Sequence, residues 1–92
     1  MSTAGYVRGH FLSGKQQALI AALQGSVQVK LVLAPTGRRF CFLVQQGEET
    51  PVDTATVASL WRRGVLVQTK EEAQGRERTI WLQLHAEFRE VA

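Results

Sequence analysis

The chain has a single cysteine, Cys41, among its 92 residues. One cysteine excludes an internal disulfide and any zinc site that is built from several cysteines. No apolar run reaches the roughly 18 residues of a membrane-spanning helix, and the N-terminus lacks the apolar stretch of a signal peptide. We therefore expect no membrane partner and a reducing, cytoplasmic location.

Motifs that carry catalytic chemistry are also missing. The sequence has no phosphate-binding glycine loop, no dinucleotide fingerprint and no G-x-S-x-G nucleophile motif. Neither histidine, His10 or His85, has the neighbouring Asp or Cys residues of a metal site. Cys41 stands between Phe40 and Phe42, which is typical of a small buried hydrophobe, although a Cys–His nucleophile pair stays formally open. We expect no enzymatic activity, no cofactor and no metal site.

What the chain does have is the composition of an ordinary folded domain. Hydrophobic residues make up 45% and charged residues 21%, enough apolar surface to offset the entropy of the chain. Eleven Lys and Arg against eight Asp and Glu give a net charge of +3, which permits an acidic partner without requiring one. The length suits a single domain. We expect an irregular N-terminal arm over residues 1–12 and one α+β domain over residues 13–92.

Two helices are predicted from their end signals. Ser13 and Gln16 have the spacing of a capping box, and Leu, Ile and Ala residues at helical spacing follow over Gly14–Gln24. The second helix is expected over Asp53–Arg63, with its first residue as N-cap. Gly64 fits the left-handed position that ends it.

After the first helix, the hydrophobic pattern changes from a helical repeat to a repeat of two residues, which predicts a hairpin. Apolar and other residues alternate over Val27–Ala34, and Pro35–Arg38 has the proline and glycine of a tight turn. A second strand is expected over Arg39–Gln46, followed by a polar loop at Gly47–Pro51.

A second hairpin is expected after the second helix. Val65–Thr69 forms its first strand, Lys70–Arg76 a polar loop, and Arg78–Leu84 the returning strand. Residues Ala86–Ala92 are either a short helical turn or a frayed tail. The predicted fold is therefore α+β, with two helices and two antiparallel hairpins in the order helix–hairpin–helix–hairpin.

The last third of the chain resembles a known family. The segment Thr56–Val67, with Leu60, then Gly64 and two apolar residues, is followed by a charged loop and the strand Thr79–Leu82. This is similar to the recognition helix and wing of winged helix-turn-helix DNA-binding domains, over about Thr50–Leu84. In place of the family's second helix, this chain has the predicted hairpin. The resemblance implies a winged-helix-like arrangement and a duplex DNA partner.

Several residues of this segment are candidate DNA contacts. Ser59 is small and hydroxylated, and Arg62 and Arg63 stand at the helix end, where arginine reaches phosphates or guanine edges. Arg76 and Arg78 belong to the predicted wing and complete one cationic face with them. The alternative is that the helix-end arginines are solvated cations that favour the helix dipole.

Two more arginines and a tryptophan are candidate contacts outside the helix. Arg38 and Arg39 at the tip of the first hairpin suit a phosphate or partner contact, or else serve as cations that deter strand pairing. Trp61 falls on the apolar stripe of its helix and is expected in the core. Trp81 alternates with the apolar residues of its strand and is either an exposed interface anchor or covered by the N-terminal arm.

Three classes of function remain open. One is a small basic DNA-binding protein, a regulator of transcription or of a mobile element, for which a homodimer on repeated half-sites is one arrangement. Another is a small phage- or plasmid-type protein that binds a host protein or nucleoprotein complex and inhibits or adapts it. The third is a structural subunit of a larger nucleoprotein assembly. DNA binding requires arginines that converge on one face, whereas an inhibitor requires apolar anchors ringed by polar groups.

Overall fold

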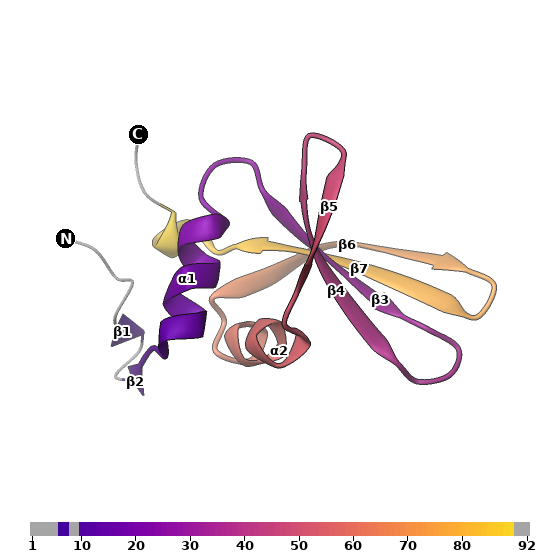
Figure 1. The fold of residues 1–92 in the computed structure, drawn as a ribbon, viewed down its shortest axis with the longest axis horizontal. Coiled ribbons are helices and arrows are strands. Elements are labelled where there is room, and N and C mark those ends of the chain that lie inside the picture. The colour runs from indigo at the N-terminus through magenta and orange to yellow at the C-terminus, as the bar shows by residue number, and fades with distance from the viewer. Residues whose placement is uncertain (1–5, 8–9, 90–92) are drawn as a thin grey trace.

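The computed structural model describes residues 6–7 and 10–89 of the chain. In this part, the helices α1 (Gly14–Ala22) and α2 (Thr54–Arg62) lie on the same side of one five-stranded antiparallel sheet (Figure 1). The sheet order is β5-β4-β3-β7-β6. Its strands are β3 (Gln28–Leu33), β4 (Arg39–Gln45), β5 (Glu48–Val52), β6 (Leu66–Gln74) and β7 (Glu77–Leu84).

The predicted order of helix, hairpin, helix and hairpin, with its winged-helix-like arrangement, is wrong. Three consecutive strands, β3, β4 and β5, separate the two helices, and β3 also pairs with β7, so that all five strands share one sheet. The expected polar loop at Gly47–Pro51 is largely β5, and the expected polar loop at Lys70–Arg76 is largely the extension of β6. Both segments are exposed, and their pairing to a neighbouring strand, not apolar patterning, holds them extended.

Two-residue turns set the register of the outer strands. Gln46 and Gly47 both have positive φ, which matches the twist of a type I′ hairpin and lets β5 return along β4. Gly75, with φ +61°, takes the first turn position between β6 and β7. Gly37, with φ +88°, closes the turn of the first hairpin, where its N–H donates to the Ala34 carbonyl.

The helix ends follow the capping signals of the sequence. The Ser13 hydroxyl accepts from the Gln16 N–H, and the Gln16 side chain accepts from the Ser13 N–H, so the capping box is confirmed. The Asp53 carboxylate accepts from the N–H and hydroxyl of Thr56 at the start of α2. The Val65 N–H donates to the Leu60 carbonyl after α2, which is the Schellman closure expected around the following glycine.

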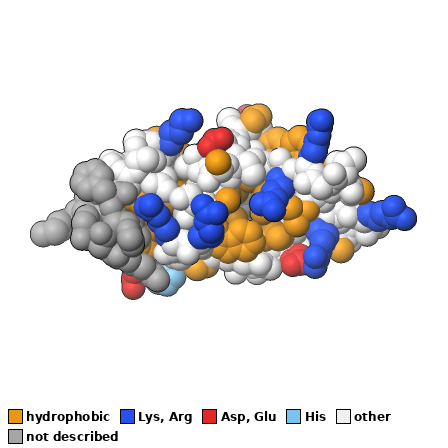
Figure 2. Space-filling view, turned by 90° about the horizontal axis from the view of Figure 1, so that it is seen from below, with side chains coloured by type: hydrophobic (Ala, Val, Ile, Leu, Met, Phe, Trp, Pro, Cys, Tyr) orange, Lys and Arg blue, Asp and Glu red, His pale blue; other side chains and the backbone are white. Residues whose placement is uncertain are grey.

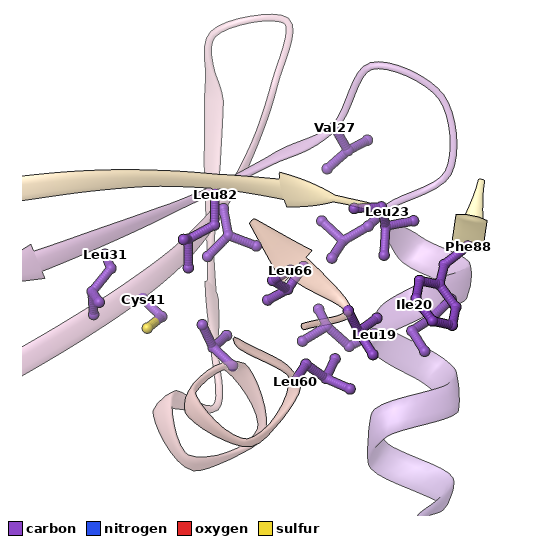
Figure 3. Packing of buried hydrophobic residues seen from close by; sticks show 14 of the residues in the cluster. Leu19, Ile20, Leu23, Val27, Leu31, Cys41, Leu60, Leu66, Leu82 and Phe88 are labelled. Atoms are coloured by element: carbon purple, nitrogen blue, oxygen red, sulfur yellow. The ribbon is translucent and has the colours of Figure 1, made fainter. Parts of the chain in front are cut away.

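The core lies between the two helices and one face of the sheet. Figure 3 shows Leu60 of α2, Leu66 of β6 and Leu82 of β7 converging with the apolar side chains of α1. The single-turn 3₁₀ helix at Ala86–Phe88 adds Phe88 to this cluster, and its carbonyl accepts from the Gln24 side chain. This 3₁₀ helix is thereby held beside the C-terminal end of α1.

At the N-terminal end, the described part of the arm forms two short strands, β1 (Tyr6–Val7) and β2 (His10–Phe11), which pair with each other. Figure 1 places them beside α1, at the end of the molecule away from the hairpin tips. Leu12, which the sequence analysis assigned to the arm, is fully buried in the core.

Candidate functional site

A row of side chains crosses the sheet beyond the part that α2 covers. Residues paired directly across antiparallel strands share a face, so the register sets Arg39, Leu33 and Arg78 side by side on β4, β3 and β7. The next row on the same face includes Cys41, which is buried under α2. A small pocket of about 30 Å³ under α2 is lined by both Arg39 and Trp61. The row therefore lies on the helix side of the sheet.

Arg62 adds a third arginine to this side. Arg62 lies in the last turn of α2, two residues after the buried Leu60. Two residues correspond to a rotation of about 200° around the helix axis, so the Arg62 side chain points away from the core, and it is exposed. We name Arg39, Arg62 and Arg78 the arginine surface. Figure 2 looks onto the side where α2 lies and shows Lys and Arg side chains spread over it, with few acidic ones among them. The sequence analysis expects one cationic face of Arg62, Arg63, Arg76 and Arg78; of these four, Arg62 and Arg78 belong to the arginine surface, and Arg39 joins them.

The arginines of this surface differ in how far they are neutralised. Arg78 forms an ion pair with Glu71 of β6, at 2.6 Å between Nη2 and Oε2, so part of its charge is already compensated. Arg39 and Arg62 are exposed. Arg38 and Arg76 are exposed in the β3–β4 and β6–β7 turns, at the far end of the molecule from α1. Arg39 and Arg62 are therefore the strongest candidates for an anionic partner.

Ser59 and Arg63 serve the helix packing instead of the surface. The Ser59 hydroxyl accepts from Nε2 of Gln16 at 2.7 Å, which ties α2 to α1. Nη1 of Arg63 donates to Oε1 of the same glutamine at 3.4 Å, and Arg63 is half-buried. Gln16 is a buried polar residue whose side chain is fully used in this network. The sequence identified Gln16 as a capping residue but gave no sign of its contact with α2.

Trp81 lies on the other side of the sheet and does not join the arginines. Its ring is half-exposed and lies between two ammonium groups, with Lys30 Nζ at 5.9 Å and Lys70 Nζ at 5.6 Å from the ring centroid. Its Nε1 donates to Oε1 of Glu72 at 2.9 Å. The residues predicted from the sequence therefore divide between two opposite surfaces.

Trp81 belongs to an apolar sheet face that no helix of the described chain covers. The register puts Phe42, Lys30 and Trp81 in one row, with Phe40 and Val32 in the adjoining row of the same face. Phe40 is 43% exposed and is the one large hydrophobic side chain of the described residues classed as exposed. We name this surface the open face; its apolar members are Val32, Phe40, Phe42, Val44, Pro51, Val67 and Trp81.

Two ion pairs join charged groups of the open face. Lys30 pairs with Glu49 of β5, and Lys70 pairs with Glu72, each at 3.1 Å. The hydrogen bonds from Lys70 and from the Trp81 ring lower the pKa of the Glu72 carboxyl, which keeps it ionised. Glu77 lies on the same face, and Lys30 stands between Phe42 and Trp81, so charged side chains are interspersed with the apolar ones.

Cys41 has the properties of a packing residue. Burial raises the pKa of its thiol, against the opposing effect of a hydrogen bond with Thr54, and a protonated thiol is a poor nucleophile. Among residues 6–7 and 10–89, no three His, Cys, Asp or Glu side chains gather as metal ligands would. Neither helix in the described part of the chain has the length and apolar character needed to cross a membrane.

Comparison with known proteins identifies no relative. No protein-family model matches the chain, and neither a curated protein nor a solved structure matches it at a significant level. Function must therefore be argued from the two surfaces themselves.

Proposed function

We propose that this is a small cytoplasmic DNA-binding protein that holds duplex DNA on the arginine surface, as a regulator would. The observation that carries the proposal is the register of the sheet, which sets Arg39 and Arg78 on either side of Leu33, on the helix side and beyond the part that α2 covers. Arg62 projects from the last turn of that helix on the same side. Three guanidinium groups from three separate elements, β4, α2 and β7, share one side of a molecule of net charge +3.

The chemistry of arginine suits a phosphate backbone. A guanidinium group donates two parallel hydrogen bonds to phosphate oxygens, and it is less strongly hydrated than an ammonium group. Arg39 stands on a paired strand and Arg62 on a helix, so the scaffold restricts the motion of both side chains. Each phosphate contact releases counterions, so this mode of binding depends strongly on salt.

A salt series of duplex binding tests the proposal. A labelled random-sequence duplex, short enough for one protein copy, is titrated by fluorescence anisotropy between about 50 and 200 mM salt. We expect measurable binding at low salt and a steep loss with added salt. The double variant R39Q/R62Q is expected to bind more weakly and to reduce the salt slope by about two units, about one for each lost phosphate contact.

A charge-matched control comes from the opposite side of the sheet. The variant K30Q/K70Q removes two positive charges from the open face and is expected to retain the wild-type salt slope. Equal losses in the two double variants would mean that only net charge matters and would contradict a specific surface. A wild-type protein that ignores duplex DNA at low salt would refute the proposal and leave the alternative class, a protein that binds a host protein through the open face.

A further inference from the structure

One carboxylate of the sheet lies on the helix side beside the arginine surface. Glu71 of β6 is the register partner of Ile80 of β7, which is buried on the helix side. The Glu71 side chain therefore shares a face with Arg39 and Arg78. On the five strands, the other acidic residue of this face is Glu48, which lies at the β4–β5 turn, three rows from Arg39. Glu71 is thus the acidic side chain of the sheet that a phosphate backbone on the arginine surface would meet.

The register also sets how Glu71 reaches Arg78. Ala73 lies directly opposite Arg78, and Glu71 is two residues earlier on the same strand, so the two charged residues form a diagonal pair. Diagonal partners on one face are within reach of long side chains. Nη2 of Arg78 donates to Oε2 of Glu71 at 2.6 Å, which is shorter than the 3.1 Å of the two ion pairs on the open face.

The other two arginines of the surface differ from Arg78 in this respect. Within residues 6–7 and 10–89, no carboxylate lies within ion-pair distance of Arg39 or Arg62. Directly across the strands, Arg39 faces Leu33, which has no charge. The same surface therefore combines two arginines that are open to an anion with one that a carboxylate of the chain already occupies.

Exposure weakens this ion pair but does not separate the two charges. The side chains of Arg78 and Glu71 are 59% and 36% exposed, and exposed ion pairs add little to the free energy of unfolding. Both residues nevertheless stand on paired strands, so the carboxylate stays close to Arg78, within the screening length of about 10 Å at 0.1 M salt. A phosphate group that approaches Arg78 therefore meets a negative charge beside it.

The phosphate and the carboxylate compete for the same donors. A guanidinium group binds either anion through its planar N–H groups, so a bond to Glu71 leaves Arg78 fewer donors for phosphate oxygens. Because the carboxylate belongs to the neighbouring strand, its effective concentration at the guanidinium is on the order of millimolar or above.

We propose that Glu71 masks Arg78, which means that it keeps this guanidinium from making a phosphate contact. In the wild-type protein, Arg39 and Arg62 then make the arginine contacts with the duplex, and Arg78 makes none. The inference rests on the DNA binding proposed above and names the residue that limits it. Glu71 acts through Arg78 and does not touch the partner, so it is a positioning residue. Its presence gives a weaker and more readily reversed hold on the duplex.

The salt slope of duplex binding tests the masking, because the slope counts phosphate contacts. E71Q is expected to steepen the slope by about one unit and to raise duplex affinity at 100 mM salt about five- to tenfold. R78Q is expected to keep the wild-type slope, because a masked arginine releases no counterions on binding. The double variant E71Q/R78Q is expected to return to the wild-type slope, since the newly available contact is gone.

The next residue in the chain provides a matched control. Glu72 stands on the same strand, is exposed and forms an ion pair with Lys70, but its side chain lies on the open face. E72Q removes the same charge as E71Q and is expected to leave the slope unchanged. Both variants are expected to melt within a few degrees of the wild type, because exposed ion pairs contribute little to stability.

Three results would overturn the inference. The first is an R78Q variant that loses as much slope as R39Q, which would mean that Arg78 already contacts phosphate. The second is an equal effect of E71Q and E72Q, which would mean that only net charge matters. The third is an E71Q/R78Q variant that keeps the steeper slope, which would mean that the gain does not pass through Arg78.

A second polyanion separates this inference from the proposed DNA binding. The same variants are eluted by salt from immobilised heparin, a sulfated polysaccharide, and E71Q is expected to elute at higher salt than E72Q. If the wild type ignores duplex DNA and this difference is seen, the proposed function fails and the masking stands. If the wild type binds the duplex and E71Q leaves the slope unchanged, the masking fails and the proposed function stands. A chain that neither polyanion retains in any variant would overturn both.

Discussion

The two faces of the sheet are built from alternate residues of the same strands, yet only one is covered. On the helix side, Val29 and Leu82 are completely buried under α1 and α2. On the open face, Val32 and Trp81 stay half-exposed. A strand that is apolar on both faces is typical of a sheet buried on both sides. The comparison teaches that the described chain covers one face of its sheet with helices and leaves the other face exposed.

The two sides also differ in charge. The helix side bears the exposed Arg39 and Arg62. Figure 2 shows Lys and Arg side chains spread over the side where α2 lies, with few acidic ones among them. The open face pairs each of its lysines with a glutamate. An excess of positive charge on one side of the molecule suits a polyanion.

The largest expected loss of unfolding free energy comes from a substitution in the core, on the helix side of the sheet. Leu82→Ala removes a completely buried side chain on the helix side and is expected to cost about 2–5 kcal/mol of unfolding free energy. Phe42→Ala on the open face is expected to cost only about 1 kcal/mol in dilute protein, since this ring is half-exposed. Urea denaturation of both variants at low concentration measures the difference. Similar costs would show that the open face is as buried in the monomer as the core.

The contact between the two helices should have an intermediate effect. Gln16→Ala leaves the Ser59 hydroxyl without its donor and the Ser13 N–H without its acceptor, at an expected cost of about 1–3 kcal/mol. Ser59→Ala is expected to cost about 1 kcal/mol and to leave duplex affinity unchanged, because its hydroxyl faces α1. Denaturation and anisotropy on the same samples check both statements. A loss of DNA affinity in folded Ser59→Ala protein would mean that Ser59 contacts DNA.

The smallest effect concerns the cap of α2 and depends on pH. The hydrogen bonds from Thr56 lower the pKa of Asp53 in the folded protein. Its contribution to stability is therefore complete above the unfolded pKa of about 3.9 and is lost as pH falls through the lower folded value. Asp53→Ala is expected to lower the melting temperature by a few degrees at pH 7, a gap that closes at acidic pH.

Asp53→Asn provides the control for this titration, since asparagine caps a helix without ionising. The difference in melting temperature between the Asn and Ala variants is expected to persist in acid, where the wild type falls toward the Ala variant. A wild-type advantage that does not change with pH would mean that the Asp53 carboxylate is not the capping group.

Local signals in the sequence predicted the helices but not the extent of the sheet. Capping side chains and glycines act over a few residues, so Ser13, Asp53 and Gly64 mark helix ends without help from the fold. The strand β5 has the sequence Glu-Glu-Thr-Pro-Val, for which the sequence analysis predicts a polar loop over Gly47–Pro51, because the extended form of β5 comes from its pairing with β4. The local sign of this hairpin is the Gln46–Gly47 pair, which forms a two-residue turn.

The candidate site was predictable only in its residue types. The alternation of side-chain direction along β4 already places Phe40 and Phe42 on one face of the sheet and Cys41 on the other. It does not show which of the two faces the helices cover. Pairing between β3 and β7 brings Arg39 and Arg78 to one row, although 38 positions separate them in the chain (78 − 39 − 1). Such long-range register depends on the assembled sheet, and no local pattern encodes it.

The salt dependence of duplex affinity tests most directly the central claim that the two sides of the sheet differ in role. Fluorescence anisotropy compares the wild type, R39Q/R62Q and K30Q/K70Q on one short duplex. The account predicts a steep salt slope that falls by about two units in R39Q/R62Q and is retained in K30Q/K70Q. Equal losses in the two double variants, or a wild-type protein that ignores the duplex at low salt, would contradict it.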